Sequence, residues 1–256
     1  MTSCKSAATS FYDPAFAPVT TGDLFIPDKL RPNAPPVLLI HGGGWSSMRR
    51  QDVVGIADWL AETGRIVFSI DYRLTGQAPW PACGDDCLKA AEFLRTGDLP
   101  IPGKRDRIGV IGGSAGGHLA LMTGMRFPAT RWTISISGIA DPIPYLLASK
   151  GVFNAFFGYR ITLENLIEAF PISLLDKPDL PPILCTHMLT DDVVPLASAL
   201  NFIEAAERRG VKIDSELYPA APGVTGHGIW IPGSSPHRLL PELEAKMAAW
   251  IDAHEA

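Results

Sequence analysis

The stretch Gly112-Gly113-Ser114-Ala115-Gly116 is the strongest indication of fold in this chain. It follows the apolar run at 108–111 and precedes the alanine- and leucine-rich stretch at 118–122. This order predicts a strand that turns sharply into a helix and leaves the serine hydroxyl exposed at the end of a sheet. Glycines on both sides of the serine permit such a tight turn without side-chain clashes. Because five residues of these types are common, the interpretation depends on the rest of the chain.

The rest of the chain alternates apolar runs with helical patterns. Strands are predicted at 36–40, 65–70, 108–111, 132–136, 183–186 and 213–218, and helices at 51–62, 83–95, 115–125, 196–209 and 237–253. This alternation predicts an α/β fold with a mostly parallel sheet and helices on both faces. The apolar runs lack strict two-residue alternation, as expected of strands buried on both sides. Residues 20–26 are expected to add an antiparallel edge strand.

Length and composition predict one globular domain, residues 1–256, with 46% hydrophobic and 19% charged residues. A net charge of -5 gives no electrostatic reason to bind nucleic acid or an anionic membrane. No apolar run approaches the roughly 20 residues of a membrane span. The first six residues carry no apolar signal region, which indicates a cytoplasmic protein, or a periplasmic or secreted one if a signal peptide was removed. Whether the chain forms a homodimer stays open.

Four cysteines are too few for a disulfide scaffold. Cys83 and Cys87 stand four residues apart and would share one helix face. No second ligand pair has matching spacing, so we expect no metal site. A local disulfide and two buried thiols are both compatible with this spacing.

The segment at 139–175 is longer than a simple crossover between two strands and is rich in aromatic and aliphatic residues. We expect it to form a small cap or lid beside the carboxyl edge of the sheet. Apolar residues on such a long connection often line a pocket. Phe156, Phe157 and Tyr159 are therefore candidates for substrate contact, with ordinary packing of extra helices as the alternative.

A serine nucleophile requires a base, a group that orients the base, and donors for the oxyanion. His227 is the candidate base because it follows the last predicted strand on a glycine-rich loop. The orienting acid is Asp191 or Asp192, and one of the two could instead cap the next helix. The remaining histidines fit the role of base less well: His41, His118, His187, His237 and His254. His41 ends a strand, where a structural hydrogen bond is expected, and His237 is expected on a helix face.

Oxyanion donors are expected from the glycine loop (residues 41–45, His-Gly-Gly-Gly-Trp). Glycines after a strand let backbone N–H groups face a ligand. The N–H of Ala115 adds a donor at a helix N-terminus, where the helix dipole favours negative charge. A phosphate loop is excluded because the Gly-Lys-Ser/Thr ending is missing, and no G-x-G-x-x-G follows a first strand. We therefore expect no cofactor.

The candidates occur in the order serine, acid, histidine, with the glycine loop upstream, as in α/β-hydrolases. The chain resembles α/β-hydrolase esterases of the carboxylesterase and hormone-sensitive-lipase kind, and above all small bacterial acetyl- or feruloyl-esterase-like enzymes. The stretches that carry the resemblance are 41–45, 71–74, 80–82 with Asp86, 113–120, 191 with 193–195, and 226–228.

This resemblance implies an α/β-hydrolase fold with the triad Ser114, Asp191 and His227. In that family an acid followed by one residue and Val-Val-Pro is the triad acid, which selects Asp191 over Asp192. The oxyanion donors implied are the N–H groups of Gly43, Gly44 and Ala115. The chain departs from the lipase-like branch at Gly113, where an acid is usual, and at His187-Met188, where His-Gly is usual. The N-terminal stretch is short for a large helical cap, which implies a rather open pocket.

These residues predict a serine carboxylesterase that hydrolyses small acyl esters, such as acetyl groups on sugars, through an acyl-enzyme. Trp45, Trp80 and Trp230 lie near the named loops and are expected either to stack on a sugar or aryl group or to pack in the core. An amidase similar to kynurenine formamidase, which shares the H-G-G-x-W pattern, is the first alternative. A lactonase or other small-ester hydrolase is the second. A binding module with the same fold is the third, disfavoured because all three triad candidates are present.

Overall fold

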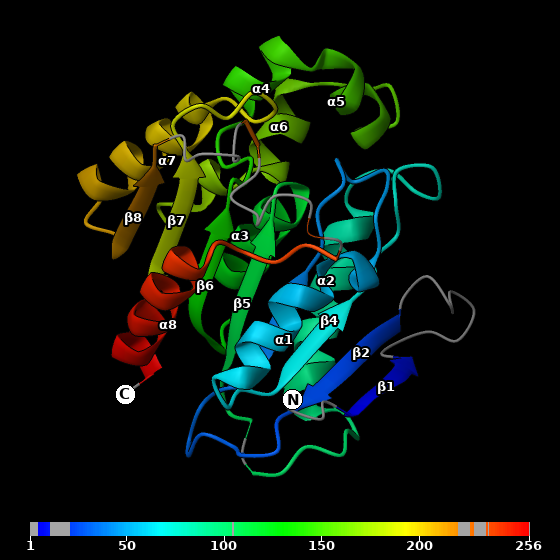
Figure 1. Cartoon of the computed structure of the whole chain (residues 1–256). Helices are drawn as coiled ribbons and strands as arrows, with labels where there is room; N and C mark the ends of the chain where they lie inside the picture. Colours follow the sequence, from blue (N-terminus) through cyan, green and yellow to red (C-terminus); the bar gives the residue numbers. More distant parts are fainter. Residues whose placement is uncertain are drawn as a thin grey trace.

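The computed structural model describes residues 5–10, 21–103, 105–219, 226–227, 234 and 236–255. Within them eight strands form one sheet in the order β1-β2-β4-β3-β5-β6-β7-β8 (Figure 1). The strands are β1 Lys5–Ser10, β2 Thr21–Ile26, β3 Val37–Ile40, β4 Val67–Ile70, β5 Ile108–Gly113, β6 Thr130–Ile136, β7 Ile183–Met188 and β8 Ile213–Tyr218. The six strands from β4 to β8 in this order are parallel, whereas β2 is antiparallel to both β4 and β1.

Helices cover both faces of the sheet, as predicted. They are η2 Arg50–Val53, α1 Val54–Glu62, α2 Ala82–Thr96, α3 Ala115–Arg126, α4 Pro142–Ala148, α5 Lys150–Phe156, α6 Leu163–Ala169, η3 Pro171–Leu174, α7 Leu196–Arg208 and α8 Pro241–Glu255. Helices α1 and α8 pack on one face of the sheet, and α2, α3 and α7 pack on the other (Figure 1). Among the described residues, no helix combines the length and apolar character needed to cross a membrane.

Strand β3 explains why the apolar runs lack a polar alternation. Val37 and Leu39 pack into the core formed with α1 and α8, whereas Leu38 and Ile40 pack into the core formed with α2 and α3. All four side chains are fully buried. Successive side chains of a strand point to opposite faces, so a strand covered on both faces is apolar at every position.

Three details differ from the sequence-based expectation or decide between its alternatives. Strand β1 pairs with β2 at the edge of the sheet, although Lys5–Ser10 has no apolar run. Helix α8 begins at Pro241, four residues later than predicted, because proline is favoured in the first turn, where its missing N–H is not needed. Cys83 and Cys87 are buried free thiols, and burial raises the pKa of Cys83 to about 12.

The direction in which the chain adds strands to the sheet reverses at β3. This strand pairs with β4 on one side and with β5 on the other, so the chain first moves outward to β4 and then returns across β3 to β5. Open α/β sheets bind ligands at the carboxyl ends of the strands where the direction reverses. The glycine loop follows β3 and Ser114 follows β5, so both lie at this point.

The β5–α3 turn (residues 112–116) is closely packed against β3. A Cβ atom on Gly116 would lie 2.2 Å from the carbonyl oxygen of Ile40 and 2.4 Å from that of His41. A Cβ atom on Gly112 would lie 2.3 Å from the carbonyl oxygen of Gly116. Because these neighbours are backbone atoms, they cannot move aside, and only glycine fits at either position.

We predict that Gly116→Ala lowers the free energy of unfolding by at least about 2 kcal/mol, since the new methyl group would separate α3 from β3. Gly151→Ala is the matched control, because a Cβ atom on this helical glycine meets no described atom within 4 Å. That control should leave the free energy of unfolding within about 1 kcal/mol of the wild type or raise it. Urea unfolding followed by circular dichroism measures both, and equal effects would contradict the packing argument.

Candidate active site

Ser114 occupies the turn between β5 and α3 in a strained conformation, with φ 56° and ψ -124°. Its N–H donates to the Ile136 carbonyl at 2.8 Å, and its carbonyl accepts from the His118 N–H at 3.1 Å. A non-glycine residue in such a conformation costs on the order of 1–3 kcal/mol and persists only where its surroundings impose it. Here the glycines and the two hydrogen bonds impose it, and Ser114 lines a cavity.

The cavity at Ser114 has a volume of about 280 Å³. Segments far apart in the chain form its walls: Gly42, Gly43, Gly44, Met48, Val53, Ile56, Gly113, Ser114, Tyr145, Val193, His227 and His237. Met48, Val53 and Ile56 make one wall apolar. His237 lies before α8 and lines this cavity, which corrects its expected place on a helix face. Sequence periodicity gave no sign of this role because the residues between the last strand and α8 follow no regular pattern.

His227 and Asp191 are joined by hydrogen bonds. The His227 Nδ1 atom lies 2.8 Å from Asp191 Oδ2 and 3.0 Å from Oδ1. The Asp191 side chain is fully buried, and its Oδ1 also accepts the N–H groups of Val193 at 3.0 Å and Val194 at 2.8 Å. Burial alone would raise the pKa of this carboxyl, but the hydrogen bond and charge of His227 and the two N–H groups hold the pKa below its ordinary value. The carboxylate is therefore ionised and fixes the imidazole.

Asp192 contacts the backbone of His227 and not its ring. Its Oδ1 accepts the His227 N–H at 2.9 Å. Gly226, with φ +68°, lies so close that a Cβ atom there would be 2.1 Å from the same oxygen. Within the described residues no side chain caps α7, so neither acid serves as the helix cap considered from the sequence. The two adjacent acids hold different parts of one histidine.

The remaining ring nitrogen of His227, Nε2, forms no hydrogen bond with the part of the chain that the structure describes. This nitrogen is buried. Ser114 and His227 line the same cavity, so a group bound there meets a hydroxyl and an unpaired imidazole nitrogen together. In the part of the chain that the structure describes, no three His, Cys, Asp or Glu side chains are grouped as metal ligands would be.

The glycine loop forms a tight turn against Ser114. Gly43 and Gly44 have φ +96° and +58°, and the Gly43 carbonyl accepts the N–H groups of Ser46 and Ser47 at 3.0 Å. A Cβ atom on Gly42 would lie 3.2 Å from the Ser114 Cβ, so the loop touches the β5–α3 turn. The N–H groups of Gly43 and Gly44 bond to no acceptor among the described residues.

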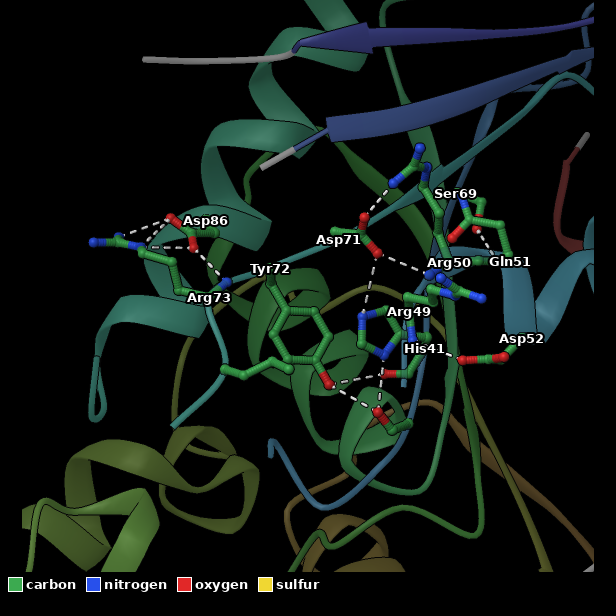
Figure 2. A network of polar contacts seen from close by, with 12 residues as sticks. His41, Arg49, Arg50, Gln51, Asp52, Ser69, Asp71, Tyr72, Arg73 and Asp86 are labelled. Carbon is green, nitrogen blue, oxygen red and sulfur yellow. Dashed lines mark hydrogen bonds and ion pairs between the residues drawn. The ribbon is translucent and has the colours of Figure 1, made fainter. Parts of the chain in front are cut away.

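A polar network supports the start of the glycine loop (Figure 2). The Tyr72 hydroxyl is 3.1 Å from the carbonyl oxygens of both His41 and Gly42 and donates to them. The His41 ring stacks on the Tyr72 ring with 4.3 Å between the ring centres, and its Nε2 lies 3.8 Å from Asp71 Oδ1. The Asp71 carboxylate also accepts the backbone N–H of Arg50 at 2.8 Å and a hydrogen bond from the Arg50 guanidinium. His41 therefore has a structural role, and burial lowers its pKa.

Most of the aromatic residues considered for substrate contact lie elsewhere. Trp45, Phe156 and Phe157 are 0%, 0% and 5% exposed and belong to the core, whereas Tyr159 is 81% exposed on the surface. Trp80 is half-buried and packs on Phe156. None of the five lines the cavity at Ser114, which argues against the expected contacts. Trp230 lies outside the described residues, and Tyr145 of α4 lines the cavity instead.

His118 links the glycine loop to the segment between β6 and β7. Its Nδ1 accepts the Trp45 Nε1–H at 3.1 Å, and its Nε2–H donates to the Ala169 carbonyl at 2.6 Å. Phe156 and Phe170 pack around the same ring. This imidazole is a buried structural contact and not a second base.

Comparison with known proteins relates the chain to esterases. The family model BD-FAE matches residues 23–138. Esterase LipC of Mycobacterium tuberculosis is 26% identical over 218 residues, which cover 76% of this chain and 53% of that esterase. The chain spans about half the length of the mycobacterial and plant relatives it matches.

Solved structures share the fold over nearly the whole chain. A truncated carbohydrate esterase from gut microbiota has a TM-score of 0.81 and 19% identity, and the match covers 98% of this chain and 96% of that one. Esterase B from Lactobacillus rhamnosis has a TM-score of 0.81 and 20% identity, covering 98% of this chain and 87% of that one. At this identity the likeness concerns the fold alone.

We predict that His118 makes stability depend on pH. Burial lowers its pKa from 6.5 to about 4, although the Ala169 hydrogen bond opposes this. Between those values the unfolded chain binds a proton that the folded chain does not, so the free energy of unfolding falls as pH falls, by about 3 kcal/mol in total. His118→Gln removes the ionisation and should lose correspondingly less stability between pH 7 and pH 4. Urea unfolding at several pH values measures this, and an unchanged loss would contradict it.

Proposed function

Because the chain has the α/β-hydrolase fold and is related in sequence to esterases, we propose that it is a serine carboxylesterase acting on small acyl esters. Ser114 is the nucleophile, His227 the base and Asp191 the acid that orients it. The observation that carries this proposal is the His227 ring, which Asp191 holds from behind and which lines the same cavity as Ser114, with Nε2 unpaired among the described residues.

In the proposed mechanism, Ser114 Oγ attacks the ester carbonyl carbon while His227 Nε2 takes the hydroxyl proton. The tetrahedral intermediate collapses, and His227 returns the proton to the leaving alcohol. Water then attacks the acyl-enzyme by the same route and releases the acid. Asp191 keeps the Nδ1 proton in place and stabilises the imidazolium, since its buried carboxylate faces that nitrogen.

The oxyanion is proposed to bind three backbone donors. Two of them are the N–H groups of Gly43 and Gly44 in the glycine loop. The third is the N–H of Ala115, the first residue of α3. An N–H in the first turn of a helix has no intrahelical acceptor, and the helix dipole adds partial positive charge there. Such donors already point at the position where charge develops, so they need no reorganisation during the reaction.

The cavity favours a short acyl group. Its volume of about 280 Å³ and its apolar wall of Met48, Val53 and Ile56 suit acetyl or a similarly small group. We propose an acetylated carbohydrate as the substrate class, in line with the name of the gut carbohydrate esterase that shares the fold. We also propose that the helices between β6 and β7 form a small cap on a single domain. The position of Tyr145, a residue of α4, in the cavity wall supports this.

We predict that Ser114→Ala lowers kcat for p-nitrophenyl acetate at least about 10³-fold, because the nucleophile is lost. Ser215→Ala on the exposed side of β8 is the control and should keep wild-type activity. Stopped assays at 405 nm and circular dichroism separate lost chemistry from lost folding. Hydrolysis by folded Ser114→Ala at the wild-type rate would refute the mechanism.

The same assay extends to substrate choice. Acetylated xylo-oligosaccharides, feruloyl esters and N-formylkynurenine separate a sugar deacetylase, an aryl esterase and a formamidase. The proposal requires the highest kcat/KM on an acetyl ester, and a higher value on N-formylkynurenine would favour the amidase.

Asp191→Asn and Asp192→Asn provide a matched pair. Asp191→Asn removes the charge that faces the His227 ring and should lower kcat about 10³-fold to 10⁴-fold. Asp192→Asn keeps an oxygen able to accept the His227 N–H and should lower kcat less than about tenfold. Steady-state kinetics on p-nitrophenyl acetate compares the two, and equal losses would contradict the assignment of Asp191 as the orienting acid.

A further inference from the structure

His187 is the penultimate residue of β7, lies beside Asp191 and has no part in the mechanism above. Its side chain is 1% exposed. The Nε2 atom lies 3.0 Å from the Val194 carbonyl oxygen and 3.3 Å from Asp191 Oδ2. Both neighbours are acceptors, so Nε2 carries the proton, which it donates to the Val194 carbonyl. The other nitrogen, Nδ1, is buried without a partner among the described residues. The polar contacts of this ring therefore come from the Nε2–H group alone.

Asp191 and His187 belong to one closed set of contacts. Val194 donates its N–H to Asp191 Oδ1 and accepts from His187 through its carbonyl. Asp191 Oδ2 faces His227 Nδ1 at 2.8 Å and His187 Nε2 at 3.3 Å. His187 therefore holds the turn on which the carboxylate sits by donating to the Val194 carbonyl, and this places its polar Nε2–H group 3.3 Å from the oxygen that faces His227.

We propose that His187 is a positioning residue that orients Asp191 and weakens the negative charge that this carboxylate presents to His227. This inference rests on the proposed function for the roles of Asp191 and His227. A donor near a carboxylate makes it a weaker base and therefore a weaker partner for an imidazolium. The charged and titratable groups that act on His187 are Asp191 and His227.

His187 itself remains neutral at neutral pH. Burial lowers its pKa, the Val194 carbonyl and Asp191 oppose this, and His227 lowers it further. A neutral donor weakens the field of Asp191 without cancelling it. A protonated ring in the same place would compete with His227 for the carboxylate, so its neutrality keeps the pair intact.

His187→Gln and His187→Leu test this inference. The Gln side-chain amide reaches the position of Nε2 and keeps a donor, whereas Leu fills the space without one. Nuclear magnetic resonance of the His227 ring gives its titration midpoint without any turnover. We expect the midpoint to rise by at least about 0.5 pH units in His187→Leu and to stay near the wild type in His187→Gln. The acid limb of kcat/KM should move in the same direction.

Two results would overturn the inference. One is a midpoint in folded His187→Leu equal to that of the wild type, or an equal shift in both variants, which would make His187 a packing residue. The other needs no variant: nitrogen shifts of the wild-type His187 ring that place its proton on Nδ1. If the wild type hydrolyses no ester, the proposed function fails, while the His227 titration still decides whether His187 acts through Asp191.

Discussion

The close approach of α3 to the end of β3 is the constraint on which the rest of the structure depends. Gly112 and Gly116 remove the side chains that would hold these elements apart, since either Cβ atom would lie within 2.3 Å of a backbone oxygen. The approach forces Ser114 into its strained conformation and places it against the glycine loop. Because β3 and β5 are neighbours where the sheet changes direction, the two loops meet at the mouth of one crevice.

A buried carboxylate organises the opposite wall of that crevice. An ionised group without solvent is costly unless hydrogen bonds replace its lost water. Asp191 receives these from the turn that follows it and from His227, and His187 lies beside it. The same contacts that make burial of the charge tolerable also fix the direction of the imidazole. Stability of the turn and orientation of the base therefore arise from one set of interactions.

The aromatic residues near the glycine loop connect this loop and α3 to the helices between β6 and β7. Trp45, His118 and Phe156 pack on one another, and the backbone N–H of Trp80 donates to the Phe156 carbonyl at 2.8 Å. Apolar residues on a long connection look the same in sequence whether they line a pocket or fill a core. Only their contacts separate the two cases, which is why the expected substrate contacts were not found at the cavity.

The sequence alone determined the features that depend on neighbouring residues. Glycines around Ser114 and uninterrupted apolar runs predicted the turn, the strands and the covered sheet, because steric freedom and hydrophobic periodicity are local properties. Tertiary structure decided what depends on residues far apart. The residue types alone left Asp191 and Asp192 open, and a family pattern favoured Asp191. Only the fold shows Asp191 against the ring of His227, 36 positions away, and Asp192 against its backbone N–H. The same holds for His187, whose position beside the carboxylate requires the turn to close around it.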